Sequence, residues 1–481
     1  MAMAIATAAL LVALSGRYGY HRDEVYFLAA GRHPAWSYPD QPPLTPLIAR
    51  LMSAIAPDSL VVLRLPAALA AAATVVLTGA MARELGAGRA GQTLAAACVG
   101  FSGSTFAIFH SLGTTAFDVL FWTLVSFLVI RQLRGANSRG WLLVGLALGV
   151  ALQNKTLIAF LVLTLLVGLL VGGPRSVLRS PWFYAGGVLA LLIVAPVGLW
   201  QADHGWPQVA LSRSIAGGGS TSSQPWYLFL PFQILLYSPL YVPIWAVGWW
   251  RLFRAPAMQR FRCFAIAFAL LVVLFLLTGG KPYYLAGLYP VLLAAGAQPT
   301  VAWVQRGQGA VRRGSVFAVV ALSLVITAGL MLPVWPATWL SGSPMMAVNP
   351  DIGETVGWPR MVAAVDTAYA SAPAGSVVLT RNYGEAGAVD HFGPALGLPA
   401  AFSGHNAYGL WGPPRPAAPG SAVVIGYPAD QLSRWFTTCR PGAVVDNGVG
   451  LDNEEQGRTV YICTGLRGSW AEIWPQLVRL G

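Results

Sequence analysis

Long apolar runs alternate with short polar segments along the first two thirds of the chain. A helix needs roughly 20 apolar residues to cross the hydrocarbon core of a bilayer. Two shorter runs flank Gln153-Asn154-Lys155 and are expected to be the arms of a hairpin. The pattern predicts a polytopic α-helical membrane protein with about eleven transmembrane helices. These helices are expected at residues 2–15, 60–80, 92–109, 119–131, 141–152, 156–171, 183–200, 226–249, 263–278, 285–299 and 315–332.

The loops between the runs differ in charge, and the difference predicts the orientation of the chain. Every strongly basic loop falls on one side when the runs alternate across the bilayer. Cytoplasmic loops carry an excess of Lys and Arg, so this side is expected to be the cytoplasm. The outer face then carries a separate set of charged residues: Asp23, Glu24, Asp40, Asp118, Lys155, Asp203 and Lys281.

Two outer segments contain more than a short turn. The first outer loop, residues 16–59, contains Pro42-Pro43, which can begin a helix, followed by leucines and isoleucines at helical spacing. We expect an amphipathic helix there, lying on the outer membrane surface. Residues 201–225 contain the Gly/Ser-rich run 217–223, which suits either a mobile lid or a slack connector.

The texture of the chain changes near Trp335. Residues 336–481, the C-terminal region, have Pro/Gly turns, β-type runs at 376–380, 422–426 and 459–463, and helix-like stretches at 358–370 and 384–392. This predicts a small extracytoplasmic α/β domain after a transmembrane domain at 1–335. Cys439 and Cys463 both fall in it and could form a disulfide in an oxidising exterior.

Composition and charge agree with a membrane protein. Hydrophobic residues make up 56% of the chain and charged residues only 10%, against about 25% charged in soluble domains. The net charge of +12 could suggest nucleic acid. Because the basic residues lie in short loops between apolar runs, they are better explained by orientation in the bilayer. The expected partner is the lipid bilayer and not a nucleic acid.

Candidate chemistry centres on Asp23 and Glu24, which follow the first apolar run. Acidic residues are scarce, 18 in 481, and two adjacent carboxylates meet water at a helix end. One of them could be a general base. Arg22, Lys155 and Lys281 could hold a phosphate. Hydroxyl donors or an aromatic face for a sugar could come from Tyr283 and Tyr284.

Each of these residues also has a structural explanation. Asp23-Glu24 could be a solvated helix terminus, and Asp118 could be the N-cap of the fourth span. The lysines could be interfacial residues whose stems lie in lipid, and Tyr283-Tyr284 could belong to an aromatic belt. No metal-ligand spacing is found among the cysteines and histidines.

Several motifs resemble those of the GT-C class of membrane glycosyltransferases. The first outer loop, with Asp23-Glu24 and then Tyr38-Pro39-Asp40-Gln41-Pro42-Pro43-Leu44, is similar to that of the protein O-mannosyltransferase and lipid A aminoarabinose transferase superfamily, in its actinobacterial form. Asp118, the hairpin lysine motif at 153–155, and residues 280–284 with Tyr289-Pro290 resemble further motifs of that group. The resemblance covers roughly residues 1–335.

The resemblance implies an inverting sugar transfer at the outer face of the plasma membrane. The donor would be a polyprenyl-phosphate sugar and the acceptor a cell-envelope protein, lipid or glycan. Asp23 would be the base, with Glu24, Asp118 and the lysines positioning acceptor or donor phosphate. Metal dependence differs across the class, which leaves a divalent cation open and implies no certain cofactor. Candidates for acceptor or sugar contacts are His21, Tyr26, Asp40, Gln41, His110 and Asn154.

The alternative function is a transporter or flippase of lipid-linked sugars. It would require ionisable groups near mid-membrane, or two related halves with broken helices. The charged residues gather at one face and no internal repeat is visible. A receptor-like role for the C-terminal region would leave the acidic first loop unexplained. The sequence leaves open the sugar, the acceptor, and the choice between Asp23 and Glu24 as base.

Overall fold

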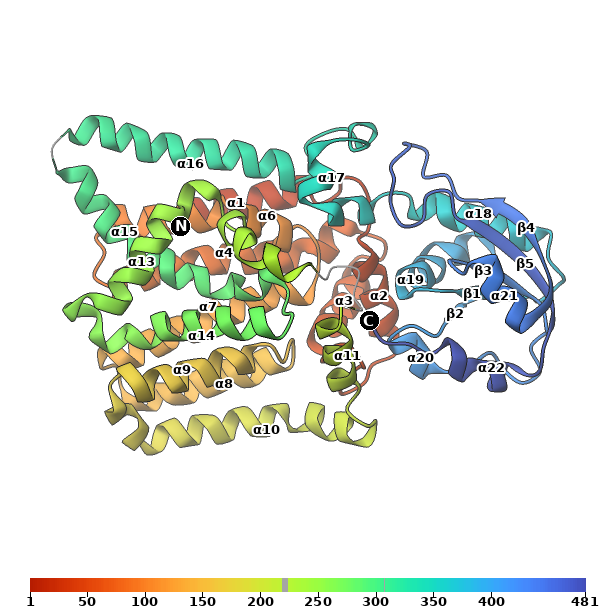
Figure 1. Cartoon of the computed structure of the whole chain (residues 1–481), viewed down its shortest axis with the longest axis horizontal. Helices are drawn as coiled ribbons and strands as arrows, with labels where there is room; N and C mark the ends of the chain where they lie inside the picture. Colours follow the sequence, from red (N-terminus) through yellow and green to blue (C-terminus); the bar gives the residue numbers. More distant parts are fainter. Residues whose placement is uncertain (219–223, 307) are drawn as a thin grey trace.

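The chain has two structurally different ends, a helical bundle and a small β-sheet (Figure 1). The computed structural model describes residues 1–218, 224–306 and 308–481. Most of the predicted Gly/Ser-rich run, residues 219–223, lies outside the described residues. The bundle is built from the first two thirds of the chain, and the sheet from the C-terminal region.

Six described helices are long and apolar enough to cross a membrane, and two bent pairs raise the number to eight. The six are α4 (Leu60–Glu84), α7 (Thr114–Arg134), α10 (Pro181–Asp203), η5 (Pro256–Phe261) with α14 (Arg262–Leu277), η6 (Pro282–Leu288) with α15 (Tyr289–Gln305), and α16 (Gly309–Met331). Shorter apolar helices are α1 (Ala2–Leu14), α8 (Trp141–Leu152), which follows η1 (Ser138–Gly140), and α9 (Ile158–Gly172). The chain is a multi-pass membrane protein, and the count of eleven spans stays a prediction.

Two spans that the apolar pattern predicted to be continuous helices are broken. The run at 92–109 divides into α5 (Arg89–Gly100) and α6 (Gly103–Phe109), which are bent by 53°. The hydroxyl of Ser102 caps α6 by accepting from the Thr105 N–H at 3.2 Å. The run at 226–249 is also broken, and its two halves are bent by 74°. At the break, Pro239 follows the capping residue Ser238 and lacks the N–H that would continue the helical hydrogen bonds.

The second broken span contains four short elements. They are η3 (Trp226–Leu228), α12 (Phe229–Leu235), η4 (Pro239–Tyr241) and α13 (Val242–Arg254). The expected loop at 201–225 contains a helix, α11 (Pro207–Ala216). Its first residue is a proline, which is suited to the first turn of a helix because no N–H partner is needed there.

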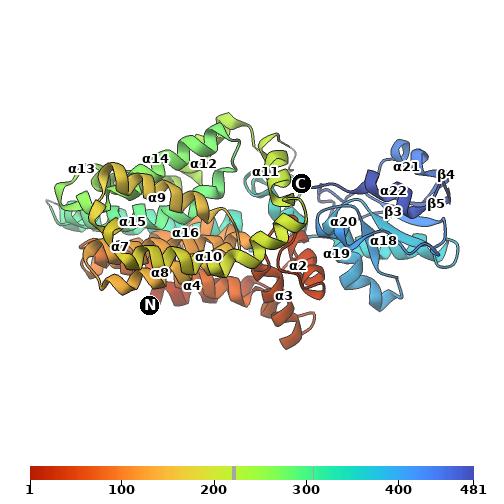
Figure 2. The same cartoon turned by 90° about the horizontal axis from the view of Figure 1, so that it is seen from below.

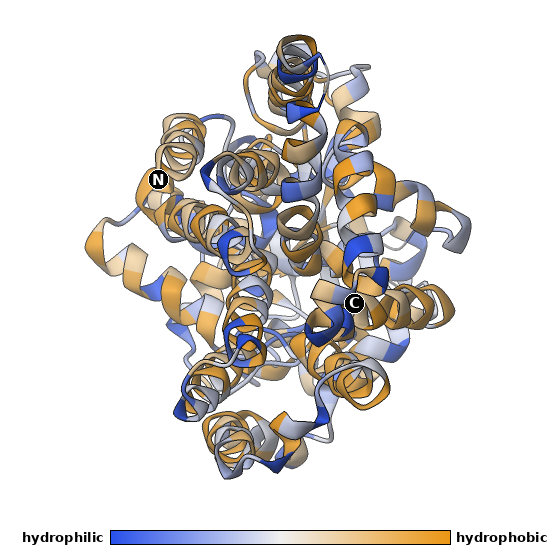
Figure 3. Cartoon of the chain, turned by 90° about the vertical axis from the view of Figure 1, so that its left-hand side faces the viewer, coloured by the Kyte–Doolittle hydropathy of each residue, from blue (hydrophilic) through white to orange (hydrophobic). Residues whose placement is uncertain are grey.

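The flanks of the bundle are apolar. Seen end-on in Figure 3, the surrounding helices are coloured mostly as hydrophobic. The peripheral helices α10 and α16 expose large side chains to their surroundings, among them Leu191, Leu192, Leu199, Phe317 and Val325. In a helix all backbone groups are satisfied internally, so such a surface is stable in lipid.

The first outer loop folds into two helices, α2 (Arg22–Arg32) and α3 (Leu44–Ile55). The helix predicted after Pro43 is confirmed as α3, with Thr45 and Ala49 buried and Leu47 and Leu51 exposed. Its place on the membrane surface stays a prediction. The helix α2 was not predicted.

The C-terminal region folds around a five-stranded sheet of order β2-β1-β3-β5-β4. Its strands are β1 (Val377–Thr380), β2 (Ala401–Ser403), β3 (Ala422–Ile425), β4 (Phe436–Val444) and β5 (Thr459–Leu466). The strand β1 is parallel to β2 and β3, whereas β5 is antiparallel to β3 and β4. The three predicted strands are confirmed, and β2 and β4 were missed. Cys439 and Cys463 face each other across β4 and β5 and form a disulfide.

Helices cover both faces of the sheet. Val377 and Leu379 of β1 pack with α21 (Ala429–Trp435) and α22 (Trp470–Leu477). Val378, on the opposite face, belongs to the core that includes α18 (Trp358–Ala370) and α19 (Tyr383–Phe392). Both predicted C-terminal helices are therefore confirmed. The connecting elements are η2 (Arg175–Arg179), η7 (Ala337–Trp339), α17 (Pro344–Val348), η8 (Pro350–Thr355), η9 (Gly393–Leu396) and α20 (Ala407–Trp411).

The sheet end meets the bundle end through α19 and α2, which lie side by side in both side views (Figures 1 and 2). Their core is continuous, because buried residues of α2 and of α19 belong to the same apolar cluster. The first outer loop is therefore held between the membrane bundle and the C-terminal region.

Within the bundle, α13 and α15 touch backbone to backbone. A Cβ added to Gly248 would overlap the carbonyl oxygen of Leu292, and one added to Gly296 would overlap that of Ile244. Small residues allow such close packing of membrane helices, where dispersion and not the hydrophobic effect drives association.

We predict that Gly248→Ala lowers the free energy of unfolding by about 1–3 kcal/mol, because its methyl group drives α13 and α15 apart. Denaturation of the purified protein in mixed micelles measures the change. Gly329→Ala in α16 is the matched control, since a Cβ there meets nothing within 4 Å. Equal stability of the two variants would contradict the close packing.

Candidate active site

The start of α2 orients Asp23 and Glu24 in different directions. His21 is the N-cap: its Nδ1 accepts from the Asp23 N–H at 3.2 Å, and its own N–H donates to Oε2 of Glu24 at 2.8 Å. This is a capping box, which satisfies donors that a helix start leaves unpaired. Because successive helical residues point about 100° apart, Glu24 turns into the protein and Asp23 turns away.

Glu24 is fully buried and pairs with Arg64 of α4, which is also buried. Arg64 donates to both carboxylate oxygens, from Nε at 2.8 Å and from Nη2 at 2.7 Å. The N–H of Leu112 donates to the same carboxylate at 2.8 Å. Arg64 also donates to the carbonyls of Ser15 and Gly19, both at 2.7 Å. A solvated terminus is therefore the wrong description of Glu24, whose oxygens join the start of α2 to Arg64 of α4 and to the turn before α7.

Asp23 remains accessible, with a side chain that is 40% exposed. Its Oδ1 accepts a hydrogen bond of 2.8 Å from the hydroxyl of Tyr383 in α19. Burial by its neighbours acts to raise the pKa of Asp23, but His21, Arg22 and the Tyr383 hydrogen bond together hold it below its ordinary value. Asp23 is thus an ionised carboxylate at neutral pH in a position that a substrate can reach.

Asp40 lies close enough to Asp23 for the two carboxylates to interact. The hydroxyl of Tyr26 donates to Oδ1 of Asp40 at 2.8 Å and accepts from the Ala407 N–H at 3.3 Å. Burial raises the pKa of Asp40 to about 7, and the charge of Asp23 adds to the rise. Gln41 is buried beside it, and its Nε2 has no hydrogen-bond partner among the described residues.

The hairpin tip brings Lys155 to the same end of the bundle. Asn154 is buried and fastens the tip, because its Nδ2 donates to the Thr114 carbonyl at 2.8 Å and its Oδ1 accepts from Thr45 at 2.9 Å. Lys155 Nζ then donates to Oγ1 of Thr115 at 3.2 Å. It also lies over two aromatic rings, 5.6 Å from Tyr283 and 5.4 Å from Tyr284.

Asp118 is not the N-cap of its helix, as one explanation of the sequence had it. The N-cap of α7 is Gly113, and Asp118 is buried inside the helix, in the turn that follows the first. It lies within electrostatic range of Lys155, as does Asp23. Asp118 and Asp23, from different segments, therefore both lie near Lys155.

Lys281 precedes η6 and is buried. Burial, and then the charge of Lys155, lower the pKa of Lys281 to about 8. Asp23 opposes that shift. The two lysines and Asp23 thus form one electrostatic group contributed by three separate segments.

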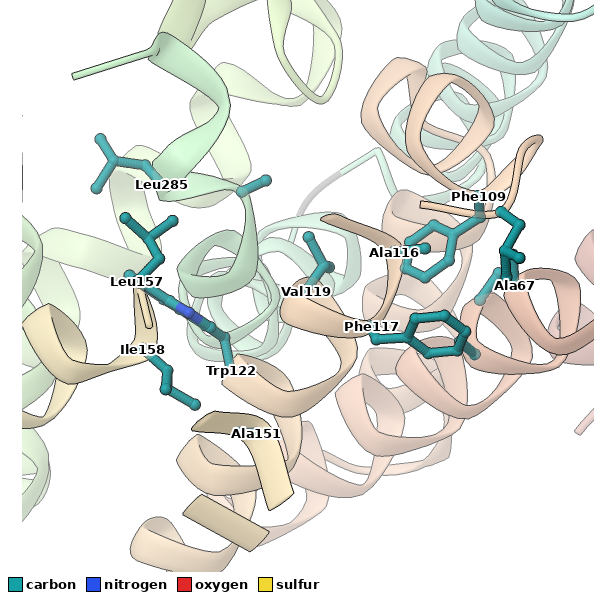
Figure 4. Packing of buried hydrophobic residues seen from close by; sticks show 14 of the residues in the cluster. Ala67, Phe109, Ala116, Phe117, Val119, Trp122, Ala151, Leu157, Ile158 and Leu285 are labelled. Atoms are coloured by element: carbon teal, nitrogen blue, oxygen red, sulfur yellow. The ribbon is translucent and has the colours of Figure 1, made fainter. Parts of the chain in front are cut away.

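An apolar floor fixes these segments. Figure 4 shows Trp122 of α7 beside Leu157 and Ile158 at the start of α9, with Leu285 of η6 nearby, and all four are buried. A Cβ on Gly287 would overlap the Trp122 side chain. This packing sets the positions of Lys155, at the hairpin tip, and of Lys281, ahead of η6.

Arg22 points to the C-terminal region. Its Nη1 lies 2.8 Å from Glu454 and 3.5 Å from Glu354, and its guanidinium lies 5.5 Å from the centre of the Tyr383 ring. Within the described parts of the chain, one group of three His, Cys, Asp or Glu side chains has ligand atoms close enough together to hold a metal ion. It consists of Glu354, Glu454 and Glu455. Because Arg22 pairs with two of them, a cation is already present there.

Sequence reasoning missed Tyr383, Glu354, Glu454 and Arg64. Arg64 carried a signal, since it is a charged residue within the apolar run at 60–80, and such residues usually have a buried partner. Nothing near Tyr383 in the sequence indicated a contact with Asp23. His110 was a candidate for sugar contacts; it is buried, with Nε2 3.5 Å from Nη1 of Arg64.

The chain combines a membrane bundle, with acidic and basic groups gathered at one end, and a small mixed domain, and known proteins share this arrangement. Residues 40–200 match the family described as dolichyl-phosphate-mannose-protein mannosyltransferase. The chain has the fold of ArnT from Cupriavidus metallidurans bound to undecaprenyl phosphate, with a TM-score of 0.58 at 17% identity over 96% of this chain and 97% of that one. For the apo form the TM-score is 0.62 at 14% identity, with the same coverage.

A curated relative points the same way. Undecaprenyl phosphate-α-4-amino-4-deoxy-L-arabinose arabinosyl transferase 1 of Pseudomonas fluorescens is 28% identical over 215 residues, which is 41% of this chain. The match spans about a third (36%) of that relative. The predicted resemblance to the mannosyltransferase and aminoarabinose transferase superfamily is confirmed by these comparisons.

We predict that Glu24→Gln lowers the free energy of unfolding by about 3–5 kcal/mol, because it leaves the buried Arg64 without a counter-charge. Denaturant titration in mixed micelles measures the loss. Asp58→Asn is the control. The Asp58 side chain is 82% exposed and makes a long ion pair of 3.8 Å with His391, so loss of its charge should lower the free energy of unfolding by less than about 1 kcal/mol. A Glu24→Gln protein as stable as the control would show that the pair does not hold the fold.

Proposed function

We propose that this protein transfers a sugar from a polyprenyl-phosphate donor to a cell-envelope acceptor at the outer membrane face, with Asp23 as general base. The observation that carries the proposal is an ionised, accessible carboxylate that shares one electrostatic group with two lysines at the end of a membrane bundle. The relatives support the donor class, since one is named for an undecaprenyl-phosphate sugar and another was solved with undecaprenyl phosphate.

The reaction is a single displacement. Asp23 takes the proton of the acceptor hydroxyl as its oxygen attacks the anomeric carbon. The bond from that carbon to the phosphate oxygen breaks, and polyprenyl phosphate leaves with the electron pair. Attack opposite the leaving group inverts the anomeric carbon. Lys155 and Lys281 stabilise the charge that grows on the phosphate, in a site where burial strengthens the interaction.

Asp23 is a better candidate for the base than Glu24. All the carboxylate capacity of Glu24 is used by Arg64 and two backbone donors. Asp23 has one oxygen bound to Tyr383 and a side chain that is 40% exposed. Tyr283 and Tyr284 would offer faces to the donor beside Lys155, and Asp40 with Gln41 would contact hydroxyls of sugar or acceptor.

The outer-face location rests on charge. The basic loops lie at the opposite ends of the spans from Asp23, and the C-terminal region contains a disulfide, which persists in oxidising compartments. Both features support an extracytoplasmic active site in the plasma membrane.

We predict that Asp23→Asn lowers sugar transfer by about 10²–10⁴-fold, because no base takes the acceptor proton. Donor binding should be retained. The measurement is transfer from a panel of radiolabelled polyprenyl-phosphate sugars to envelope extract by purified protein in lipid. Asp203→Asn, an exposed outer-face residue, is the control and should transfer normally. Transfer by neither wild type nor control with any donor would favour the transport alternative.

We predict that donor affinity falls as the pH rises through about 8. The lowered pKa of Lys281, about 8, means that its ammonium is present below this pH and lost above it. A sugar phosphodiester keeps its single charge over this range, so the lysine decides the change. Lys281→Gln should weaken donor binding about 10-fold at pH 7. Lys281→Arg should bind the donor with no such fall, and a fall that persists in it would contradict the assignment.

A further inference from the structure

The C-terminal region presents Tyr383 at a rigid position. Tyr383 is the first residue of α19 and follows the carboxyl end of β1 after two residues, Arg381 and Asn382. Asn382 caps this helix by accepting from the Glu385 N–H at 2.8 Å, and Glu385 accepts in return from the Asn382 N–H at 3.0 Å and the Arg381 N–H at 2.9 Å. This capping box fixes the first turn and with it the direction of the tyrosine.

Two glycines bring α19 into close contact with α2. A Cβ on Gly387 would lie 2.8 Å from the carbonyl carbon of Val25, and a Cβ on Gly384 would lie 2.9 Å from Cβ of Arg22. Real Cβ atoms do not approach neighbours so closely without a shift of the backbone. The separation of the two helices is therefore set at the value that lets the Tyr383 hydroxyl reach Asp23.

The ring of Tyr383 is held independently of its hydroxyl. It lies 4.7 Å from the Tyr26 ring and 4.9 Å from the His405 ring, and the Arg22 guanidinium lies 5.5 Å from its centre. These contacts would remain if the hydroxyl were removed. The hydroxyl itself is directed at Oδ1 of Asp23, 2.8 Å away.

We propose that Tyr383 is a positioning residue of the transfer site, contributed by the C-terminal region, whose hydroxyl holds Oδ1 of Asp23 so that Oδ2 receives the acceptor proton. The proposal rests on the function proposed above. Oδ2 lies 4.0 Å from Nδ1 of His21. The terminal torsion of an Asp side chain is broad, and the hydrogen bond from Tyr383 to Oδ1 restricts it.

The same hydrogen bond affects the charge of Asp23. A donor to a carboxylate favours the ionised form, so the loss of the Tyr383 hydroxyl should raise the pKa of Asp23. The other titratable groups that face Asp23 are present in both variants, so the comparison isolates the hydroxyl. They are His21 and Arg22 of α2, Asp40 of the first outer loop, Lys155 at the hairpin tip and Lys281 before η6.

The test compares Tyr383→Phe with Tyr408→Phe in the full-length protein in lipid. Tyr408 is a matched control, since its buried hydroxyl donates to Asp390 at 2.7 Å in the same region. For Tyr383→Phe we expect kcat to fall about 10-fold, KM for the donor to stay constant, and the acid limb of the pH–rate profile to move to higher pH. Tyr408→Phe should keep the wild-type profile, and identical profiles for the two variants would overturn the proposal.

A second readout does not depend on turnover. The infrared difference between a protein with Asp23 and its Asp23→Asn variant isolates the Asp23 carboxyl band, whose titration can be followed. The midpoint should rise in the Tyr383→Phe background and not in the Tyr408→Phe background. An unmoved midpoint would overturn the inference whatever the activity. If the titration midpoint of Asp23 rises but the wild-type protein transfers no sugar, the proposed function is rejected, while the hydrogen bond between Tyr383 and Asp23 is supported.

Discussion

The buried pair of Glu24 and Arg64 is the interaction on which the outer end of the molecule depends. Two charges that are taken out of water cost several kcal/mol each unless their hydrogen bonds are complete, and here they are nearly so. Arg64 bonds the carbonyls of Ser15 and Gly19, while Glu24 bonds the N–H groups of His21 and Leu112. The pair joins the end of α1, the start of α2, the start of α4 and the turn before α7, and so determines where Asp23 can be.

Adjacent carboxylates thereby have different tasks. The capping box at His21 puts both residues in the first turn of α2, and the rotation of the helix separates them. Glu24 is buried and its oxygens bond the surrounding structure, whereas Asp23 is exposed enough to contact a substrate. A site built in this way is held in place by the fold itself, which is the arrangement that preorganised catalytic groups require.

The sequence predicted the membrane class, the outer-loop helix, three strands and the candidate residues, because each produces a local pattern. It could not locate the breaks at Ser102 and Pro239, which depend on caps within apolar runs. It missed β2, which has three residues, and β4, which contains Pro441-Gly442. It also missed the contact of Tyr383 with Asp23, since 360 positions separate them and periodicity carries no information over such a distance.

Lys155 and Lys281 come from distant segments of the chain, and their proximity affects their charge. Burial, and then the charge of Lys155, disfavour the ammonium form of Lys281. Acidic neighbours, Asp23 at Lys281 and Asp118 at Lys155, favour the charged forms of the two lysines. A phosphate bound between them would relieve the repulsion and raise the pKa of Lys281, so anion binding and lysine protonation should reinforce each other. In the proposed transfer, two lysines whose positions are fixed before the reaction begins would stabilise the charge that develops on a leaving phosphate.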